Sequence, residues 1–159
     1  MAFTVRPIKN IDRPYIDAQI SKSWSGPYVV SKNVLHDTRT HTGFIAVEND
    51  VIIGYILYNI SNGDCEITVL ESLSEGRGVG SALINEVFGV AKESDCLRIW
   101  LVTTNDNIHA IRFYQRRGFE LKAVYIDAMD QARKLKPQIP MAGNDDIPIK
   151  HEFEFELVF

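Results

Sequence analysis

The chain has 159 residues, of which 45% are apolar, and a formal net charge of −4 at pH 7. Its length predicts a single domain over residues 1–159, and its acidic balance excludes a basic surface for nucleic acid. No apolar run approaches the ~18 residues of a membrane span, and residues 1–10 lack a signal-peptide pattern. Cys65 and Cys96 have no metal-ligand spacing. We therefore expect reduced core thiols, no metal site and a cytoplasmic protein.

The chain is predicted to begin with a strand and a short helix. Residues 3–8 alternate between apolar and polar, as a strand does. Asn10 or Asp12 can cap a helix that continues to about residue 20. Residues 28–35 are compatible with either a strand or an irregular arm, and the sequence does not decide between them.

Three strands in antiparallel succession are predicted next. Residues 43–48 and 51–60 flank a turn at Asn49-Asp50. A second turn at Asn62-Gly63 leads into an apolar, β-branched strand at residues 65–72, because Asn-Gly is well suited to the positive φ of a tight hairpin turn. The sequence thus predicts a β-meander whose last strand enters a glycine-rich loop.

Gly76, Gly78 and Gly80 separate this meander from a helix that begins at Val79, where apolar residues start to recur with helical spacing. A glycine has no Cβ, so a ligand can approach its backbone closely. The first N–H groups of a helix lack internal partners and lie at the positive end of its dipole. Residues 76–81 are therefore predicted to bind an anion, most plausibly phosphate. The structural alternative is a plain bend in the chain.

The order of the glycines distinguishes this loop from other phosphate loops. It matches neither G-x-x-x-x-G-K-[ST] nor G-x-G-x-x-G. It resembles the coenzyme A loop of the GCN5-related N-acetyltransferases, the GNAT superfamily, which is usually written Q/R-x-x-G-x-G/A. Gly78 and Gly80 match the two small positions, whereas Glu75 stands where the family normally has Gln or Arg. Arg77 is a candidate for the positive charge lost by this exchange.

The second half of the chain carries another match to the family. Residues 97–104 predict a strand parallel to 65–72, since a strand–helix–strand unit requires a crossover. A helix capped by Asn105 or Asp106 follows and ends at Gly118. It carries the second GNAT signature, N-x-x-A-x-x-F-Y-x-x-x-G-F. Six residues match this signature position for position: Asn107, Ala110, Phe113, Tyr114, Gly118 and Phe119.

The resemblance implies an α+β GNAT fold. Its mixed central sheet has about six to seven strands, is splayed between the fourth and fifth strands, and is flanked by helices. In the family the last two strands usually form a hairpin. Here residues 119–126 and 149–159 are the candidate strands, separated by a helical stretch at 127–135 and a loop at 136–148. This long connection is expected to cover the acceptor site, to contact a second subunit, or to be a plain surface excursion.

Side-chain alternation in these last segments predicts which residues face inward. Met129, Ala132 and Leu135 are predicted to point inward from the helical stretch. The final strand is predicted to be half-buried, with its apolar side chains on one face. The opposite face carries Glu152, Glu154 and Glu156.

The resemblance also implies the reaction and the ligand. The protein is expected to be an N-acetyltransferase that uses acetyl-CoA as cosubstrate and passes the acetyl group directly to a primary amine. Val69 and Leu70 are implied to pair with the pantetheine arm, and Asn107 to bond the coenzyme backbone. The pyrophosphate is implied to lie on the backbone of Gly76, Arg77, Gly78, Val79, Gly80 and Ser81.

Acetyl transfer to an amine requires an acid and a base. Tyr114 is the candidate donor to the leaving thiolate, because a phenol with a pKa of ~10 stays protonated at pH 7. A lysine-like amine costs roughly 4–5 kcal/mol to deprotonate at pH 7. Glu66 is the candidate base, directly or through water, and its structural alternative is an exposed strand carboxylate. Glu71, nearer the expected thioester, is the runner-up. A backbone N–H near Leu70 is the candidate oxyanion donor. Three other residues have either a site role or a plain packing or surface role: His109, Trp24 and Tyr28.

The alternative function is a non-catalytic acyl-CoA-binding sensor or regulatory module. Glu75 favours it by weakening the phosphate site, whereas Tyr114 favours an enzyme, because binding alone does not need it. The acceptor stays open among small amines, aminoglycosides, amino acids and protein N-termini or lysines. We expect no nucleic acid or membrane partner, and a homodimer is an open expectation because GNAT domains often dimerise.

Overall fold

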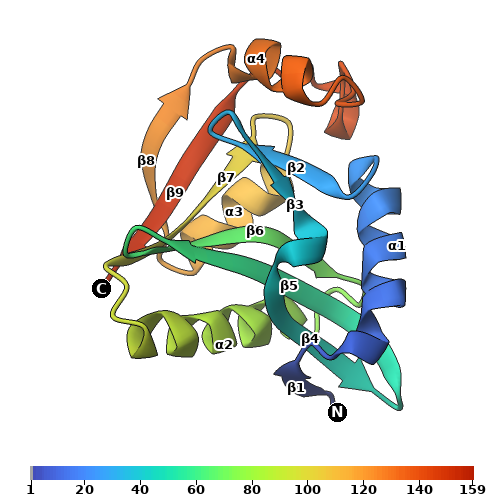
Figure 1. The fold of residues 1–159 in the computed structure, drawn as a ribbon. Helices are drawn as coiled ribbons and strands as arrows, with labels where there is room; N and C mark the ends of the chain where they lie inside the picture. The colour runs from blue at the N-terminus through green and yellow to red at the C-terminus, as the bar shows by residue number, and fades with distance from the viewer. Residues whose placement is uncertain (1) are drawn as a thin grey trace.

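The computed structural model describes residues 2–159 and is built on a seven-stranded mixed sheet in the order β1-β4-β5-β6-β7-β9-β8 (Figure 1). The strands of this sheet are β1 Thr4–Pro7, β4 Thr42–Glu48, β5 Val51–Ser61, β6 Asp64–Ser72, β7 Arg98–Thr104, β8 Glu120–Tyr125 and β9 Glu152–Val158. The helices are α1 Arg13–Trp24, α2 Val79–Glu93, α3 Ile108–Arg116 and α4 Ala128–Leu135. The predicted α+β class and the strand number are confirmed.

The helices cover both faces of the sheet. On one face, α2 contributes Val79, Leu83 and Val87 to the larger apolar core, which also contains Tyr114 of α3. On the other face, Ile16 and Ile20 of α1 pack in a second core with buried side chains of β4, β5 and β6. The helical periodicity of these segments thus predicted the buried faces correctly.

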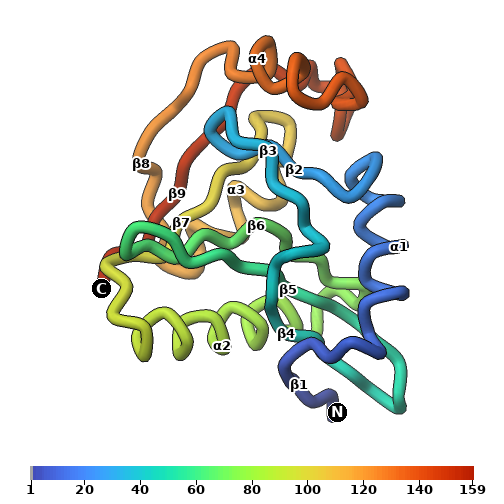
Figure 2. The backbone as a smooth tube through the Cα atoms, in the orientation of Figure 1, coloured from blue at the N-terminus to red at the C-terminus, as the bar shows by residue number. Residues whose placement is uncertain are grey.

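Residues 28–35, which the sequence left undecided, belong to a separate two-stranded hairpin of β2 Tyr28–Ser31 and β3 Val34–Asp37. Its turn has positive φ at Lys32 (48°) and Asn33 (63°), as in the meander turns. Lys-Asn is a weaker turn signal than Asn-Gly, which explains why the sequence did not decide. Figure 2 shows the turn of this hairpin beside β7, where Nζ of Lys32 lies 5.0 Å from the ring centroid of Trp100.

The predicted splay lies between β6 and β7, the fourth and fifth strands of the sheet. These two strands pair in parallel only at Asp64–Arg98, Cys65–Ile99 and Glu66–Trp100. Beyond Glu66, β6 stays paired with β5, across a register shift at Leu57/Tyr58, while β7 stays paired with β9. The sheet therefore opens between the carboxyl-terminal half of β6 and β7.

The last two strands pair with each other as expected, and β9 lies between β7 and β8. Met129 and Ala132 of α4 are buried, but Leu135 is 40% exposed, so the prediction that it faces inward was wrong. Leu135 stands at the last residue of a helix of only eight residues, where the chain already turns away.

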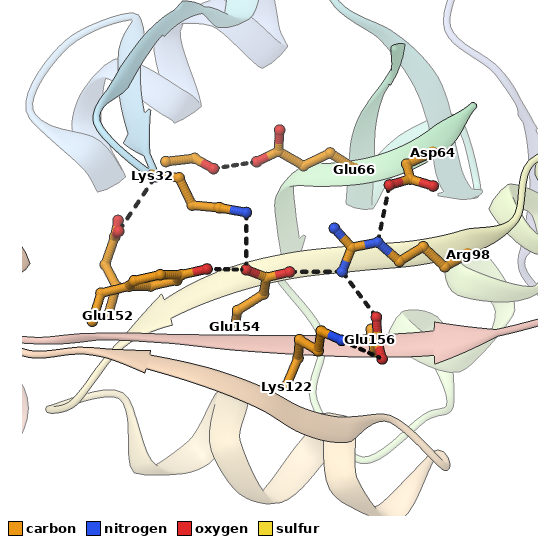
Figure 3. Close-up of polar contacts among 10 residues, drawn as sticks. Lys32, Asp64, Glu66, Arg98, Lys122, Glu152, Glu154 and Glu156 are labelled. Atoms are coloured by element: carbon orange, nitrogen blue, oxygen red, sulfur yellow. Dashed lines mark hydrogen bonds and ion pairs between the residues drawn. The ribbon is translucent and has the colours of Figure 1, made fainter. Parts of the chain in front are cut away.

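The prediction of a half-buried β9 was also wrong, because Glu152 and Glu154 are 3% and 2% exposed. The β2–β3 hairpin covers this face. The Glu154 carboxylate forms ion pairs with Nζ of Lys32 at 3.1 Å and with Nη1 of Arg98 at 2.6 Å (Figure 3). Alternation assigns residues to faces but does not show what covers each face.

Cys65 and Cys96 are free and buried, as expected. Within residues 2–159, no helix combines the length and apolar character that crossing a membrane requires.

Candidate functional site

A cavity of about 720 Å³, which we call the cleft, lies at the carboxyl-terminal end of β6, where β6 no longer pairs with β7. It extends from the end of β6, past the start of α2, to one face of α3. Trp24 at the end of α1 and Asn144 in the long connection also line it. The cleft therefore brings together the two sequence motifs that lie on either side of β7.

The glycine-rich loop leaves its backbone open to the cleft. Gly76 and Gly78 have φ values of 75° and 76°, a conformation that favours glycine, and a Cβ added at either position would meet nothing within 4 Å. Gly78 is the N-cap of α2, and the C=O of Gly78 accepts the N–H of Ala82 at 3.0 Å. The N–H groups before Ala82 have no partner within the helix. They point to an anion site of the kind the sequence predicts.

Gly80 has a different role from the other two glycines. A Cβ at this position would lie 2.8 Å from Cζ of Phe113, so glycine lets α3 pack closely on the start of α2. This contact sets the distance between the two motif helices. Glycine spacing in the sequence does not show which residue lies opposite each glycine, so this packing role could not be predicted.

Gly80→Ala is expected to lower the free energy of unfolding by about 1–3 kcal/mol, because Phe113 must shift to admit the methyl group. Gly89→Ala in the same helix is the matched control, since a Cβ there meets nothing within 4 Å. It should stabilise the protein by roughly 0.5–1 kcal/mol through helix propensity. Urea unfolding of both variants measures the contrast, and an equal effect of both would contradict the packing role.

Tyr114 is placed with its ring buried and its hydroxyl unpaired. Only 7% of the residue is exposed, and its ring packs edge-on against Phe113 and Phe119 at 5.2 and 5.4 Å. It lines the cleft, yet its hydroxyl makes no hydrogen bond to any residue among 2–159. Burial raises the pKa of this phenol, which keeps it protonated. Tyr114 thus presents a protonated donor without a protein acceptor.

The wall formed by β6 has both a backbone and a side-chain contribution. Because the N–H of Leu73 donates to the C=O of Ile53 at 2.8 Å, alternation along β6 turns the N–H of Leu70 away from β5, toward the opening. The carboxylate of Glu71 accepts hydrogen bonds from the Tyr55 hydroxyl and, at 2.9 Å, from Oγ of Ser23. Leu70 and Glu71 both line the cleft.

Glu66 lies outside the cleft lining, beneath the β2–β3 hairpin (Figure 3). It is 5% exposed, accepts a hydrogen bond from Oγ of Ser31 at 2.5 Å, and lies 3.5 Å from Nε2 of His36. Burial raises the pKa of Glu66 to about 7, and the neighbouring carboxylate of Glu152 adds to this increase. The sequence alternative of an exposed strand carboxylate is therefore wrong.

A family model described as "Acetyltransferase (GNAT) family" matches residues 9–119. This chain belongs to the GNAT family. It is 40% identical over 153 residues to the protein YdhI of Bacillus subtilis (strain 168), with 96% of each chain covered. It is 35% identical over 147 residues to YxbD of the same organism, with 92% of each chain covered.

Two solved GNAT structures show the same fold. An acetyltransferase of Bacillus subtilis in complex with CoA superimposes with a TM-score of 0.72 over 99% of both chains, at 15% identity. A GNAT family acetyltransferase of Elizabethkingia anophelis with acetyl-CoA bound also gives a TM-score of 0.72, over 99% of this chain and 98% of its own, at 14% identity.

Three residues of the predicted GNAT coenzyme site do not line the cleft. Arg77 pairs with Glu48 of β4, with Nη1 2.7 Å from Oε1. Oγ of Ser81 accepts a hydrogen bond from Nε of Arg117 at 2.7 Å. Val69 is 2% exposed and packs in the α1 core. The other predicted positions line the cleft: Leu70, Gly76, Gly78, Val79, Gly80, Asn107 and Tyr114.

Positive charge in this GNAT cleft comes from α3 instead of the glycine loop. Arg112, Arg116 and Arg117 line the cleft together with His109, and the Arg117 guanidinium stacks 3.5 Å over Phe113. Burial and the neighbouring Arg116 lower the pKa of Arg117. These arginines were not among the predicted site residues. Their i, i+3, i+4, i+7 spacing could have shown that one face of α3 carries His109, Arg112, Phe113 and Arg116.

Some of the remaining candidate residues line the cleft, and others do not. Trp24 and His109 line the cleft, whereas Tyr28 lines a separate hollow next to Lys136. Asn107 lines the cleft and also caps α3, because its Oδ1 accepts the N–H of Ala110 at 3.1 Å. A coenzyme contact and a helix-capping role are therefore both compatible with the position of Asn107.

Proposed function

We propose that this protein is an N-acetyltransferase that passes the acetyl group of acetyl-CoA directly to a primary amine, with residues 1–159 acting as one domain. The observation that carries the proposal is the unpaired hydroxyl of Tyr114, a donor that binding alone would not require. Membership of the GNAT family supports the acetyl-CoA chemistry. The neighbouring structures that contain CoA or acetyl-CoA support it further.

The residues present fit acetyl-CoA. The open backbone at Gly76 and Gly78 suits a diphosphate, and Arg112 and Arg116 supply opposite charge from α3. The free edge of β6 at Leu70 suits amide groups of the pantetheine arm, because it offers strand-like hydrogen bonds without a strand partner. In this assignment Arg77 acts through its ion pair with Glu48, which holds the loop against β4.

The chain's own residues then divide the proton transfers between them. The amine nitrogen bonds to the acetyl carbon as the carbon–sulfur bond breaks, and the acetyl-CoA supplies the activated acetyl group. The N–H of Leu70 donates to the carbonyl oxygen as it gains negative charge. Tyr114 donates a hydrogen bond to the departing sulfur, and its raised pKa favours strong hydrogen bonding over complete proton transfer.

Glu66 is the proposed base, and it accepts the ammonium proton through water, because it does not line the cleft. A pKa of about 7 suits this task, since a base is most useful when its pKa lies near the working pH. A thiol-release assay with acetyl-CoA and a panel of amines tests the function. Tight CoA binding without release for any amine would favour the alternative, a non-catalytic acyl-CoA sensor, which the acidic Glu75 beside the phosphate loop supports.

Glu75→Gln is expected to tighten CoA binding about three- to tenfold at low salt, because an exposed carboxylate in the cleft repels a bound diphosphate. The gain should shrink as ionic strength rises. Titration calorimetry with CoA measures it, with Glu93→Gln at the far end of α2 as the control. Weaker binding by the Glu75 variant would show that the carboxylate contributes to the site.

A further inference from the structure

The long connection of residues 127–148 is fixed to the α1 side of the cleft. Lys136 is 7% exposed, and its ammonium donates hydrogen bonds to the C=O groups of Trp24 and Tyr28, the latter at 2.6 Å. Met129 of α4 packs in a small core with Val30 of β2. These contacts join the connection to the end of α1 and to the β2–β3 hairpin, as the neighbouring positions of α4 and β2 in Figure 1 show.

The same connection is fixed to the α3 side of the cleft. Asp106, which is 4% exposed, accepts the backbone N–H of Asn144 at 3.1 Å and its side-chain amide at 3.2 Å. Oδ1 of Asn105 accepts the N–H groups of Lys150 and His151, both at 2.9 Å. Asn144 lines the cleft, as does Trp24 on the other side. The connection is therefore tied both to the end of α1 and to Asp106 before α3, and it reaches the cleft at Asn144.

Charged side chains line both walls of the cleft, in addition to Glu75 in the glycine-rich loop. All of its arginines stand on or at the end of α3, on the wall proposed to hold phosphate. Glu71 stands on the β6 wall, and its carboxylate is held by the hydroxyls of Tyr55 and Ser23. It forms no ion pair with any residue among 2–159. Its negative charge is thus fixed in position and left without a cation.

We infer that the acceptor is a small amine with a second cationic group, and that Glu71 holds this second group beside Trp24. The inference rests on the proposed acetyltransferase function. A carboxylate fixed by neutral hydroxyls can bind an ammonium through charge-assisted hydrogen bonds, and the indole of Trp24 can add a cation–π contact. The connection, which is held both at α1 and at Asp106 before α3, favours a short molecule over a folded polypeptide. Glu71 is a positioning residue in this assignment, while Glu66 remains the base.

The test compares amines that differ only at the far end. Thiol release is measured with 1,4-diaminobutane, butylamine, 4-aminobutanoate and a lysine-containing peptide. The diamine is expected to have a kcat/KM about 10- to 100-fold above that of butylamine, through a lower KM, because one charge-assisted contact separates them. The aminobutanoate and the peptide should be the poorest acceptors, because the first brings a carboxylate to Glu71 and the second must pass the connection.

Glu71→Gln keeps the size of the side chain and removes its charge. This variant is expected to lose the preference for the diamine, with the loss in KM, whereas Glu86→Gln on the exposed face of α2 should retain it. Equal kcat/KM for diamine and butylamine in the unmodified protein would overturn the inference and leave the proposed function intact. A peptide that outperforms the diamine would do the same. Failure of every amine despite CoA binding would overturn both.

Discussion

Tyr114→Phe is expected to lower kcat about 10²–10³-fold, because it removes the only polar atom of the side chain that faces the cleft. The ring keeps its edge-on contacts with Phe113 and Phe119, so the packing of α3 should not change. The Kd for CoA should stay within about twofold of the original value, because the hydrogen bond to sulfur strengthens only as charge develops. Single-turnover kinetics and titration calorimetry measure the two quantities separately.

Tyr58→Phe is the matched control, since Tyr58 of β5 stacks on Phe44 of β4 and does not line the cleft. It should leave kcat unchanged. If the Tyr114 variant turns over as fast as the control, the sulfur needs no donor from this side chain, and the role proposed for Tyr114 is wrong. If CoA binding is lost along with turnover, Tyr114 contributes to the coenzyme site and not to the chemical step.

Local sequence patterns were sufficient to predict the order of strands and helices, because turns and motifs each depend on residues that are close together in the sequence. Asn62-Gly63 predicts its turn since positive φ is needed there, and both residues have it, at 53° and 79°. The two GNAT motifs predicted the glycine loop and α3 because each motif is a continuous segment. The splay between β6 and β7 was implied by the resemblance to the GNAT family, which the two motifs on either side of β7 carry.

The parts of the site that the sequence did not predict depend on contacts between distant segments. The burial of Glu66 could not be predicted because nothing near it in sequence covers it, whereas Ser31, 35 residues earlier, does so in the fold. Arg77 has the right charge in the right loop, but Glu48 lies close enough to pair with it. Asn144 carries no motif, and only the hydrogen bonds of Asp106 bring it to the cleft.

Glu66→Gln is expected to lower kcat/KM about 10²–10⁴-fold at pH 8 and to remove its rise with pH. In the unmodified protein, Glu66 must be ionised to accept a proton, so activity should rise with pH through the raised pKa of about 7. Stability should change in the opposite direction. The folded state holds the Glu66 proton more tightly than the unfolded chain does, where a glutamate has its ordinary pKa of 4.5, so stability falls as pH rises from 4.5 to 7.

That difference in pKa corresponds to about 3 kcal/mol, which Glu66→Gln should recover above pH 7, because an amide carries no charge to bury. A variant that is less active and more stable at pH 8 cannot be explained by loss of structure. Urea unfolding at pH 5 and pH 8, together with pH–rate profiles, measures both effects. A variant that loses stability at pH 8 would contradict the buried charge, and an unchanged pH–rate profile would contradict the base.

Glu152→Gln provides a control on the same buried face. Burial raises the pKa of Glu152 as well, so this variant should also gain stability above pH 7. Its kcat/KM at high pH is expected to equal that of the unmodified protein. Because the Glu152 carboxylate raises the pKa of Glu66, its removal should move the midpoint of the pH–rate profile to lower pH. If Glu152→Gln shifts the midpoint of the pH–rate profile and Glu66→Gln removes the rise of activity with pH, the proton acceptor is Glu66. If Glu152→Gln leaves the midpoint unchanged, the titrating group lies elsewhere.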